Sequence, residues 1–378
     1  MSSKIKFIQE ATKPHANIAE LCREQGISRQ TAYKWLKRYR DRGYDGLEER
    51  SRRPKSTPLM TGEEVVAALL AARAAHPRWG PRKLVRVLRR SLGEATPSER
   101  TVARILDRFG EVRHRRKRRG LSVVERAPSV IAKAPNDVWT IDFKGWWRAK
   151  DGSRCDPLTV RDAFSRFVLA LALLPGSTGD EVRRVMTRLF RRYGVPKAIQ
   201  CDNGTPFICM RSPAGLTKLS AWWVSLGIRI VRTRPGCPQD NGGHERMHVD
   251  VAGDLQSLPE STVALQQRAC DRWRQEFNHV RPHDALRGKT PAEVYKPSPS
   301  RPSMRPPIYP PGWRVRRVSA TGVFGSNHTG QFISTALAGY FVGLEPIGGL
   351  RHRAWFYDVN LGELELAPTL SVLSRLAS

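Results

Sequence analysis

The first third of the chain contains segments whose apolar residues recur every three or four positions, the period of an amphipathic helix. Two such segments lie in residues 18–40, and Gly26 between them can supply a tight turn. Ser28 stands where the second helix begins, and a serine hydroxyl there can accept hydrogen bonds from the first backbone N–H groups. The apolar positions of this second helix, which we expect to face inward, are Ala32, Trp35, Leu36 and Tyr39. The pattern predicts two packed helices joined by a short turn.

Polar residues occupy the opposite face of the second helix. They are Arg29, Gln30, Lys34 and Lys37. Such side chains can contact base edges and phosphates when a helix lies in the major groove of DNA. We therefore predict a helix-turn-helix DNA-binding domain in residues 1–57, with an ordinary basic helical hairpin as the alternative.

A second set of helical segments follows a basic stretch that contains proline. We expect helices over residues 63–75, 81–92 and 97–109, the last of them capped by Ser98. Arg100 and Arg104 lie along this last helix, where they could contact DNA. The segments indicate a second helix-turn-helix domain in residues 58–112. Two such domains can recognise a longer DNA site than one.

The pattern changes to alternating strands and helices after Asp137. Expected strands cover residues 138–144, 158–160, 167–174, 198–201 and 228–231, and expected helices cover 180–193, 216–226 and a region from about 241. Strands first and then helix–strand alternation favour a mixed five-stranded sheet flanked by helices, in a domain spanning 136–300. Beyond a Pro-rich segment, short strands with glycine turns over 314–366 predict a small β-barrel within residues 301–378.

Charge adds a partner to this picture. The 378 residues include 65 Lys and Arg against 35 Asp and Glu, a formal net charge of +30, and more than half of it lies in residues 1–120. A polyanion partner relieves such self-repulsion, and nucleic acid is a better candidate than an anionic membrane surface. The run 113–119 includes Arg115 and Arg116, and within a basic linker over 113–135 it can follow phosphates. No apolar run is long enough to span a bilayer, so we expect no membrane partner.

The six cysteines are scattered and form no C-x-x-C pair. This spacing indicates reduced thiols in a cytoplasmic protein and argues against a zinc finger or ribbon.

Three carboxylates are candidates for a metal site. Asp142 lies inside an expected strand among apolar residues, an unfavourable place for an unpaired charge. Asp202 ends another expected strand, and Glu245 follows the turn Asn241-Gly242-Gly243-His244 that opens a helix. If the two strands are neighbours, Asp142 and Asp202 meet at one sheet edge. Carboxylates about 4 Å apart repel by roughly 4 kcal/mol at an effective dielectric of 20. A divalent cation removes that repulsion, and oxygen ligands suit Mg²⁺ or Mn²⁺. Asp162 and Asp180, by contrast, are expected to act as turn and helix-cap residues.

An ordered set of motifs surrounds these acids. The motifs are Trp139-Thr140-Ile141-Asp142, Asp162-Ala163-Phe164-Ser165-Arg166, Cys201-Asp202-Asn203-Gly204-Thr205, Pro238-Gln239-Asp240-Asn241-Gly242-Gly243-His244-Glu245-Arg246 and Phe277-Asn278-His279-Val280-Arg281-Pro282-His283-Asp284-Ala285-Leu286. With them the sequence resembles the retroviral-integrase-like DDE transposases of bacterial insertion sequences. The N-terminal His/Cys zinc module of retroviral integrases is absent from it.

The resemblance implies a ribonuclease-H-like catalytic core, with Asp142, Asp202 and Glu245 on the metal-binding and catalytic triad. It further implies a transposase that binds the ends of a mobile element, cleaves DNA and transfers the 3′-hydroxyl ends to target DNA. Two Mg²⁺ or Mn²⁺ ions would serve this phosphoryl transfer. The expected partners are double-stranded DNA, as element ends and as target, and further copies of the chain. The expected location is the nucleoid in the cytoplasm.

Two other functions are compatible with parts of the sequence. His244-Glu245-Arg246-Met247-His248 matches the H-E-x-x-H signature of zinc proteases. No H-x-x-G-x-x-H extension follows it, and a protease would leave the basic front end unexplained. The second alternative is a DNA-binding regulator or inactive transposase, which the helix-turn-helix domains would serve equally well. The three carboxylates favour the enzyme, because a pure DNA-binding protein has no use for them.

Overall fold

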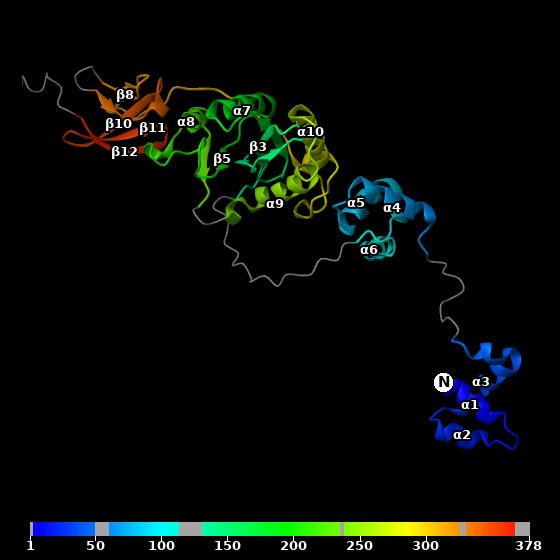
Figure 1. Cartoon of the computed structure of the whole chain (residues 1–378). Helices are drawn as coiled ribbons and strands as arrows, with labels where there is room; N and C mark the ends of the chain where they lie inside the picture. The colour runs from blue at the N-terminus through cyan, green and yellow to red at the C-terminus, as the bar shows by residue number, and fades with distance from the viewer. Residues whose placement is uncertain (1–2, 50–59, 113–130, 235–237, 326–329, 367–378) are drawn as a thin grey trace, which may run out of the picture. The chain divides into compact units, whose positions relative to one another are not determined.

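The computed structural model describes residues 3–49, 60–112, 131–234, 238–325 and 330–366. The backbone forms two compact units, Met1–Gly62 and Glu63–Ser378 (Figure 1). Within the described residues, no helix has the length and hydrophobicity required to cross a membrane. Arg115 and Arg116, which we predicted to contact DNA, lie outside the described ranges.

The first unit is a set of short helices around a small core. They are α1 (Ser3–Ala11), α2 (Ile18–Glu24) and α3 (Arg29–Arg42), followed by a 3₁₀ turn, Gly43–Leu47. Gly26 has a φ of +65° between α2 and α3, and the Ser28 hydroxyl accepts from the Thr31 N–H at 3.2 Å, so the predicted turn and cap are confirmed. The sequence analysis missed α1, which contributes the fully buried Phe7 and Ile8 to the core.

A second helical set begins the larger unit. It consists of α4 (Glu63–Ala75), α5 (Pro81–Leu92) and α6 (Glu99–Arg108). The hydroxyl of Ser98 accepts from the N–H of Thr101 at 3.2 Å and caps α6, as predicted. Buried Trp79, Leu84 and Val102 belong to the core that these helices share.

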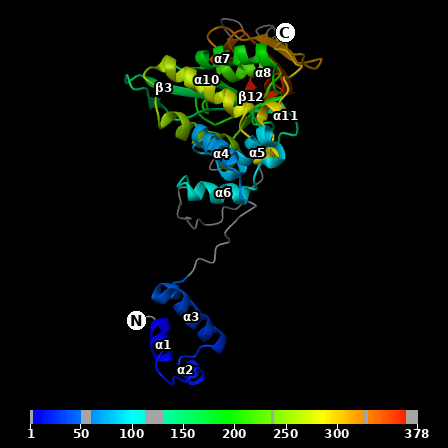
Figure 2. The ribbon, with the colours of Figure 1, turned by 90° about the vertical axis from the view of Figure 1, so that its right-hand side faces the viewer.

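The larger unit is centred on a mixed sheet (Figures 1 and 2). Its strands are β1 (Val138–Phe143), β2 (Trp147–Arg148), β3 (Arg154–Asp162), β4 (Val168–Leu174), β5 (Ala198–Cys201) and β6 (Arg229–Arg232). In the described residues, five strands follow the order β4, β3, β1, β5, β6, and the short β2 also pairs with β3. The pairs β4–β3 and β3–β1 are antiparallel, whereas β1–β5 and β5–β6 are parallel.

Helices cover both faces of this sheet. They are α7 (Gly179–Tyr193), α8 (Lys218–Ser225), α9 (Gly242–Val251), a π-helical turn (Ala252–Gln256), α10 (Val263–His279) and α11 (Pro291–Val294). On one face, α7 and α8 share a core with strand residues such as Trp139 and Ile141. On the other, α9 and α10 share a core with residues such as Cys155 and Val168. The sheet is therefore buried on both sides.

The C-terminal segment forms open sheets, so the predicted closed β-barrel is wrong. Its strands are β7 (Arg314–Arg317), β8 (Val323–Phe324), β9 (Gln331–Phe332), β10 (Phe341–Gly348), β11 (Arg351–Phe356) and β12 (Val359–Glu365). Among the described residues they make a four-stranded sheet, in the order β12, β11, β10, β7, and a separate β8–β9 pair. The apolar face of the larger sheet packs with Leu216, Ala221 and Val224 around α8. Because that neighbour buries the apolar face, the sheet need not close on itself.

Candidate active site

Two predicted carboxylates end neighbouring parallel strands. In the register of β1 and β5, Thr140 lies opposite Gln200, and Asp142 and Asp202 each follow two positions later. The carboxyl ends of parallel strands meet at the same sheet edge, so both aspartates belong to one edge. The neighbouring strands that the sequence analysis required are therefore present.

The alternation of side chains along β1 separates the aspartate from the main core. Trp139 and Ile141 point to the face that α7 and α8 cover. Asp142 shares the opposite face with Thr140, because side chains two positions apart point the same way in a strand. The hydroxyl of Thr140 lies 2.8 Å from Nδ1 of His244 on α9, so this is the face that α9 covers.

Glu245 comes to this face with the first turn of α9. Asn241, immediately before that helix, donates from Nδ2 to Oδ2 of Asp142 at 3.2 Å. Gln200 of β5 donates from Nε2 to the carbonyl oxygen of Asp240 at 2.8 Å. The start of α9 is thus attached to both strands that carry the aspartates.

Burial and the two other acids act on the carboxylate of Asp142. The pKa of Asp142 is raised to about 6, mainly because burial removes water from its carboxylate. The negative charges of Asp202 and Glu245 raise this pKa further, while the hydrogen bond from Asn241 opposes the shift. Asp202 and Glu245 are themselves exposed. One half-buried and two exposed carboxylates therefore form a cluster of negative potential at this edge.

The cluster supplies hard oxygen ligands, which match the chemistry of Mg²⁺ or Mn²⁺. In the described part of the chain, however, no three His, Cys, Asp or Glu side chains are close enough together to hold a metal ion. Burial is the main cause of the raised pKa of Asp142, and repulsion by Asp202 and Glu245 adds to it. A divalent cation would remove that repulsion.

Buried hydrogen bonds hold α9 on the sheet. Thr159 of β3 lies opposite Asp142 in the strand register. Its hydroxyl is 2.9 Å from the carbonyl oxygen of Asp142, 2.5 Å from Nε2 of His244 and 2.8 Å from Nε2 of His248. One threonine side chain therefore joins the strand of Asp142 to the helix of Glu245.

Both histidines are neutral near pH 7. Burial lowers the pKa of His244 well below its ordinary value and that of His248 to about 4. The Thr159 hydroxyl has a single proton, so at least one of the two Nε2 atoms donates to the threonine oxygen. The ring nitrogens that a zinc-protease site would need are engaged with a hydroxyl group.

Arg161 explains one glycine of the motif that precedes Glu245. Its buried guanidinium donates to the carbonyl oxygen of Gly243, and burial lowers its pKa to about 10. A Cβ atom at Gly243 would collide with this guanidinium. The sequence analysis interpreted the two glycines only as a turn, whereas Gly243 leaves room for a cation that contacts the start of α9.

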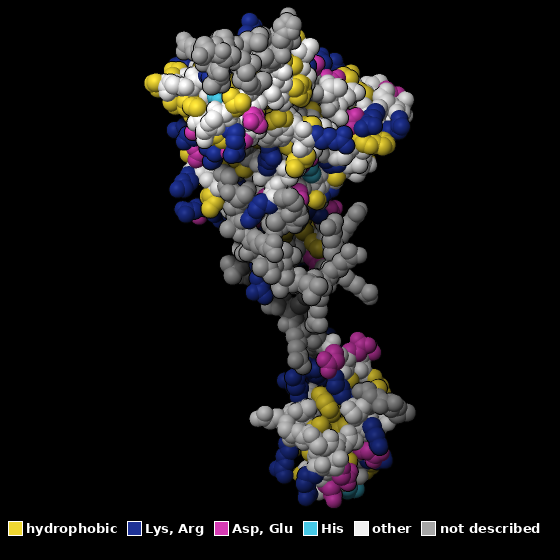
Figure 3. Space-filling view, turned by 90° about the vertical axis from the view of Figure 1, so that its left-hand side faces the viewer, with side chains coloured by type: hydrophobic (Ala, Val, Ile, Leu, Met, Phe, Trp, Pro, Cys, Tyr) yellow, Lys and Arg dark blue, Asp and Glu magenta, His cyan; other side chains and the backbone are white. Residues whose placement is uncertain are grey.

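The predicted DNA-contacting side chains of the two helical sets are exposed. On α3 they are Arg29, Gln30, Lys34 and Lys37, and on α6 they are Arg100 and Arg104. The predicted inward positions Ala32 and Leu36 of α3 are buried. Elsewhere Lys and Arg side chains are spread over the visible face (Figure 3). Exposure makes the predicted residues available to a partner and leaves their contacts a prediction.

Asp162 has the structural role that its turn position predicted. Its carboxylate accepts from the N–H of Asn136 at 2.7 Å and from the N–H and hydroxyl of Ser165 at 2.7 and 2.5 Å. The conspicuous motif around it therefore shapes the β3–β4 turn. The sequence analysis missed Thr159, Asn241 and Arg161 as residues that position the site. Only Asn241 carried a signal, since it lies four residues before Glu245 in a quoted motif.

Comparison with known proteins agrees with this architecture. Integrase core domain models match residues 132–238 and 226–291, a helix-turn-helix domain model matches 3–55, and a homeodomain-like domain model matches 31–106. These matches support the predicted ribonuclease-H-like core behind a helix-turn-helix front end.

Two insertion-element proteins are similar over most of their own length. The IS407 protein of Burkholderia multivorans is 31% identical over 233 residues, which cover 61% of this chain and 80% of that protein. The IS476 protein of Xanthomonas euvesicatoria is 26% identical over 250 residues, covering 66% and 69%.

Solved structures with local similarity include viral integrases. The catalytic core domain of HTLV-2 integrase in complex with magnesium is 18% identical, with a TM-score of 0.33, and the match covers 43% of this chain and 97% of that one. An intasome of simian T-cell lymphotropic virus is 15% identical, with a TM-score of 0.37 and coverage of 80% and 100%. With its integrase core and its insertion-element relatives, the chain belongs to the insertion-element transposases that carry an integrase core domain behind helix-turn-helix domains.

Proposed function

We propose that this transposase cleaves DNA at the ends of its element and joins the resulting 3′-hydroxyl ends to target DNA. Asp142, Asp202 and Glu245 are the proposed catalytic residues and metal ligands. The observation that carries the proposal is the shared sheet edge, where burial and two exposed carboxylates together raise the pKa of a half-buried third.

Divalent metal, Mg²⁺ or Mn²⁺, is the proposed cofactor, and two ions would activate the attacking hydroxyl and stabilise the leaving oxygen of an in-line displacement. The residues of the chain position that chemistry. Asp142 is held by Asn241 and by the strand, while Asp202 and Glu245 are exposed to solvent. No protein nucleophile is required, because water or a DNA hydroxyl attacks the phosphorus.

The proposed substrates are the two element ends and a target duplex, bound through exposed cations of α3 and α6. We expect further copies of the chain to join the DNA complex, since two ends must be processed together. A DNA-binding protein without cleavage activity is the alternative function, because the helix-turn-helix matches support binding in either case.

A strand-transfer assay tests the proposal directly. The substrate is a labelled duplex that carries the sequence flanking the gene, incubated with Mg²⁺, Mn²⁺, Zn²⁺ or EDTA. We expect cleavage and joining with Mg²⁺ or Mn²⁺, none in EDTA, and a loss of at least about a thousandfold in Asp142→Asn or Glu245→Gln, roughly 4 kcal/mol of transition-state stabilisation. Tight binding without cleavage in any metal would establish the alternative.

A second measurement separates catalysis from folding. Asp180→Asn is the matched control, since Asp180 is an exposed aspartate at the start of α7, on the opposite side of the sheet. Calorimetric titration with Mn²⁺ should show binding to the wild type and to Asp180→Asn, and none to Asp142→Asn. DNA binding by Asp142→Asn should be equal to or tighter than wild type, because a negative charge is removed.

A further inference from the structure

Within the described residues, five ion pairs join the helical set α4–α6 to the catalytic domain. The pairs are His76 with Glu276 at 3.2 Å, Arg78 with Asp254 at 3.2 Å, Arg82 with Asp284 at 3.5 Å, Arg86 with Asp284 at 2.9 Å and Arg90 with Glu293 at 3.6 Å. Every nitrogen in these pairs belongs to the helical set and every carboxylate to the catalytic domain. The two surfaces are thus complementary in charge.

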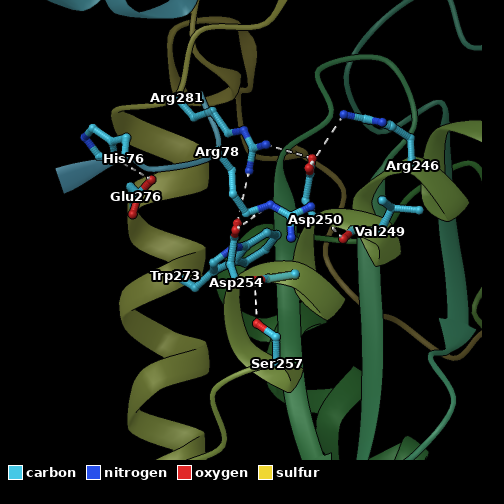
Figure 4. A network of polar contacts seen from close by, with 11 residues as sticks. His76, Arg78, Arg246, Val249, Asp250, Asp254, Ser257, Trp273, Glu276 and Arg281 are labelled. Atoms are coloured by element: carbon cyan, nitrogen blue, oxygen red, sulfur yellow. Dashed lines mark hydrogen bonds and ion pairs between the residues drawn. The ribbon is translucent and has the colours of Figure 1, made fainter. Parts of the chain in front are cut away.

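Arg78 makes the most specific of these contacts, at the π-helical turn that follows α9 (Figure 4). Its Nε lies 3.2 Å from Oδ1 of Asp254, and its Nη2 donates to the carbonyl oxygen of Val249 at 3.5 Å. The other oxygen of Asp254 accepts from Nε1 of Trp273 at 3.0 Å. Arg78 therefore contacts the helix that carries Glu245 close to its end.

Gly253 is the residue that makes this contact possible. It lies inside the π-helical turn, and glycine is among the least favourable residues in a helix interior. A Cβ atom at this position would overlap the guanidinium of Arg78. The glycine thus leaves a space that the arginine of the helical set fills, and π-helical turns recur at functional sites.

The surface below Arg78 contains a buried ion pair. Arg281, 4% exposed, lies 2.9 Å from the 9%-exposed carboxylate of Asp250, and its second nitrogen is 3.7 Å from Asp254. Separating a buried charge from its partner is costly, so this pair holds the two segments together. Arg78 therefore docks where Arg281 already joins α9 to the segment after α10.

Helix α5 extends the contact along one face. Arg82, Arg86 and Arg90 are spaced four residues apart, so they lie on the same side of the helix. Arg86 also packs beside Gly288, which has a φ of +87° that residues with a side chain rarely adopt. A Cβ atom added at this position would crowd the guanidinium of Arg86. The cations of this face are engaged with the catalytic domain, whereas Arg100 and Arg104 of α6 remain exposed.

We propose that residues 63–111 dock on the catalytic domain of the same chain through Arg78 in the space over Gly253 and the arginine face of α5. The docked set is a positioning element that fixes the separation between the DNA-contacting helix α6 and the carboxylate cluster, and with it the phosphate that is cut. This role rests on the proposed function; the docking itself does not.

The decisive variants are Arg78→Ala and Gly253→Ala, singly and together, in the full chain. Hydrogen exchange measures docking without any need for activity. We expect amides of α5 and of the π-helical turn to exchange about tenfold faster than wild type in each single variant. The double variant should exchange no faster than the single variants, because both changes remove the same contact. Arg89→Ala is the matched control, since Arg89 lies on α5, is exposed and forms no ion pair among the described residues. Exchange in Gly253→Ala equal to that of wild type would overturn the docking.

Cleavage reports the positioning role separately. A misplacement of about 1 Å can lower a reaction rate about a hundredfold. In Gly253→Ala the rate of cleavage at the wild-type position should therefore fall at least about tenfold. Its affinity for the end duplex should stay within about twofold of wild type. Unchanged position and rate, with faster exchange, would overturn the positioning role. If the wild type cleaves no DNA, the proposed function fails and the exchange result still decides the docking.

A charge exchange completes the test. Asp284→Arg should speed exchange in α5. Combining it with Arg86→Asp should restore part of the protection, because that pair is reformed with reversed polarity while Arg82 still faces the new arginine. If the combined variant exchanged as fast as Asp284→Arg alone, a specific pair between Arg86 and Asp284 would be excluded. Protection that rises with protein concentration would show that the helical set comes from a second copy, and would overturn docking within one chain.

Discussion

The two helical sets at the front of the chain are built alike but use their positive charge differently. In each, a serine caps the last helix by accepting from the N–H three residues later, Ser28 from Thr31 and Ser98 from Thr101, both at 3.2 Å. On α3, Arg29, Lys34 and Lys37 are exposed and form no ion pair within the described residues. On α5, three arginines are paired with carboxylates of the catalytic domain. Of these two basic helices, α3 leaves Arg29, Lys34 and Lys37 exposed, whereas α5 pairs three arginines with carboxylates of the same chain.

This difference cannot be recognised from the number of cations. An arginine that faces a carboxylate is neutralised and offers little attraction to phosphate, whereas an exposed, unpaired arginine offers its full charge. Mutations on α3 and on α5 should therefore have different effects on DNA binding.

For the comparison of α3 with α5, the largest effect is expected from Arg29→Ala combined with Lys34→Ala on α3. Loss of contacts of this type costs about 1–3 kcal/mol each, so we expect end-specific binding to weaken by about a hundredfold. Fluorescence anisotropy with end-bearing and scrambled duplexes measures it. Lys4→Ala with Lys13→Ala is the control, because it removes the same charge from residues already paired with Glu49 and Glu10. Equal losses in the two double variants would show that α3 acts only through net charge.

Helix α9 has two attachments of different kinds. Its hydrogen bond to the sheet between His244 and Thr159 is buried, whereas its contact with Arg78 is exposed. Thr159→Val keeps the side-chain shape but removes the hydroxyl, so the Nε2 atoms of His244 and His248 lose this partner and the Asp142 carbonyl oxygen loses one hydrogen bond. We expect a loss of about 2 kcal/mol in the unfolding free energy of the larger unit, measured by denaturant titration. Thr159→Ser should retain most of the stability, and equal loss in both variants would exclude the hydroxyl as the cause.

Removing the two caps compares the helical sets within the folded state. Ser28→Ala and Ser98→Ala should each cost about 1 kcal/mol, because the cap satisfies an exposed N–H at the helix start. Hydrogen exchange should quicken in the first turn of α3 in one variant and of α6 in the other. Faster exchange in both helices of a single variant would mean that the two sets are coupled.

The smallest effect separates α3 from α5 by salt dependence. Lys37→Ala should reduce the slope of log affinity against log salt by about 0.9, the value for one released phosphate contact. Arg86→Ala should leave the slope unchanged, since Arg86 is paired with Asp284. An equal reduction in both variants would place the arginine face of α5 on DNA.

Much of the fold was predictable because it depends on local sequence. The bounds of α4, α5 and β5 match the expected ranges, and the caps at Ser28 and Ser98 are present. Strand β3, however, is much longer than expected, and α1 was missed. Their assignment depends on packing and strand pairing with distant residues, which local periodicity does not reveal.

The acidic residues of the candidate site could be predicted from the sequence, but the residues that position them could not. Strand ends and a helix start identified Asp142, Asp202 and Glu245, and their catalytic roles remain a proposal. Thr159 was hidden because a threonine inside a strand is ordinary, and only the register with Asp142 and the position of α9 make it a junction. The closed β-barrel was a wrong prediction because turn spacing cannot show that α8 covers one face of the sheet.

By itself, the sequence determined the order of helices and strands, the caps and turns between them, the basic front end and the identity of the acids. These features depend on residues a few positions apart or on composition. The tertiary structure decided which cations are paired, which glycines make room for an arginine and how α9 is attached to the sheet. Arg86 and Asp284 are 198 positions apart, and Thr159 and His244 are 85 apart, so only the folded chain brings these groups together.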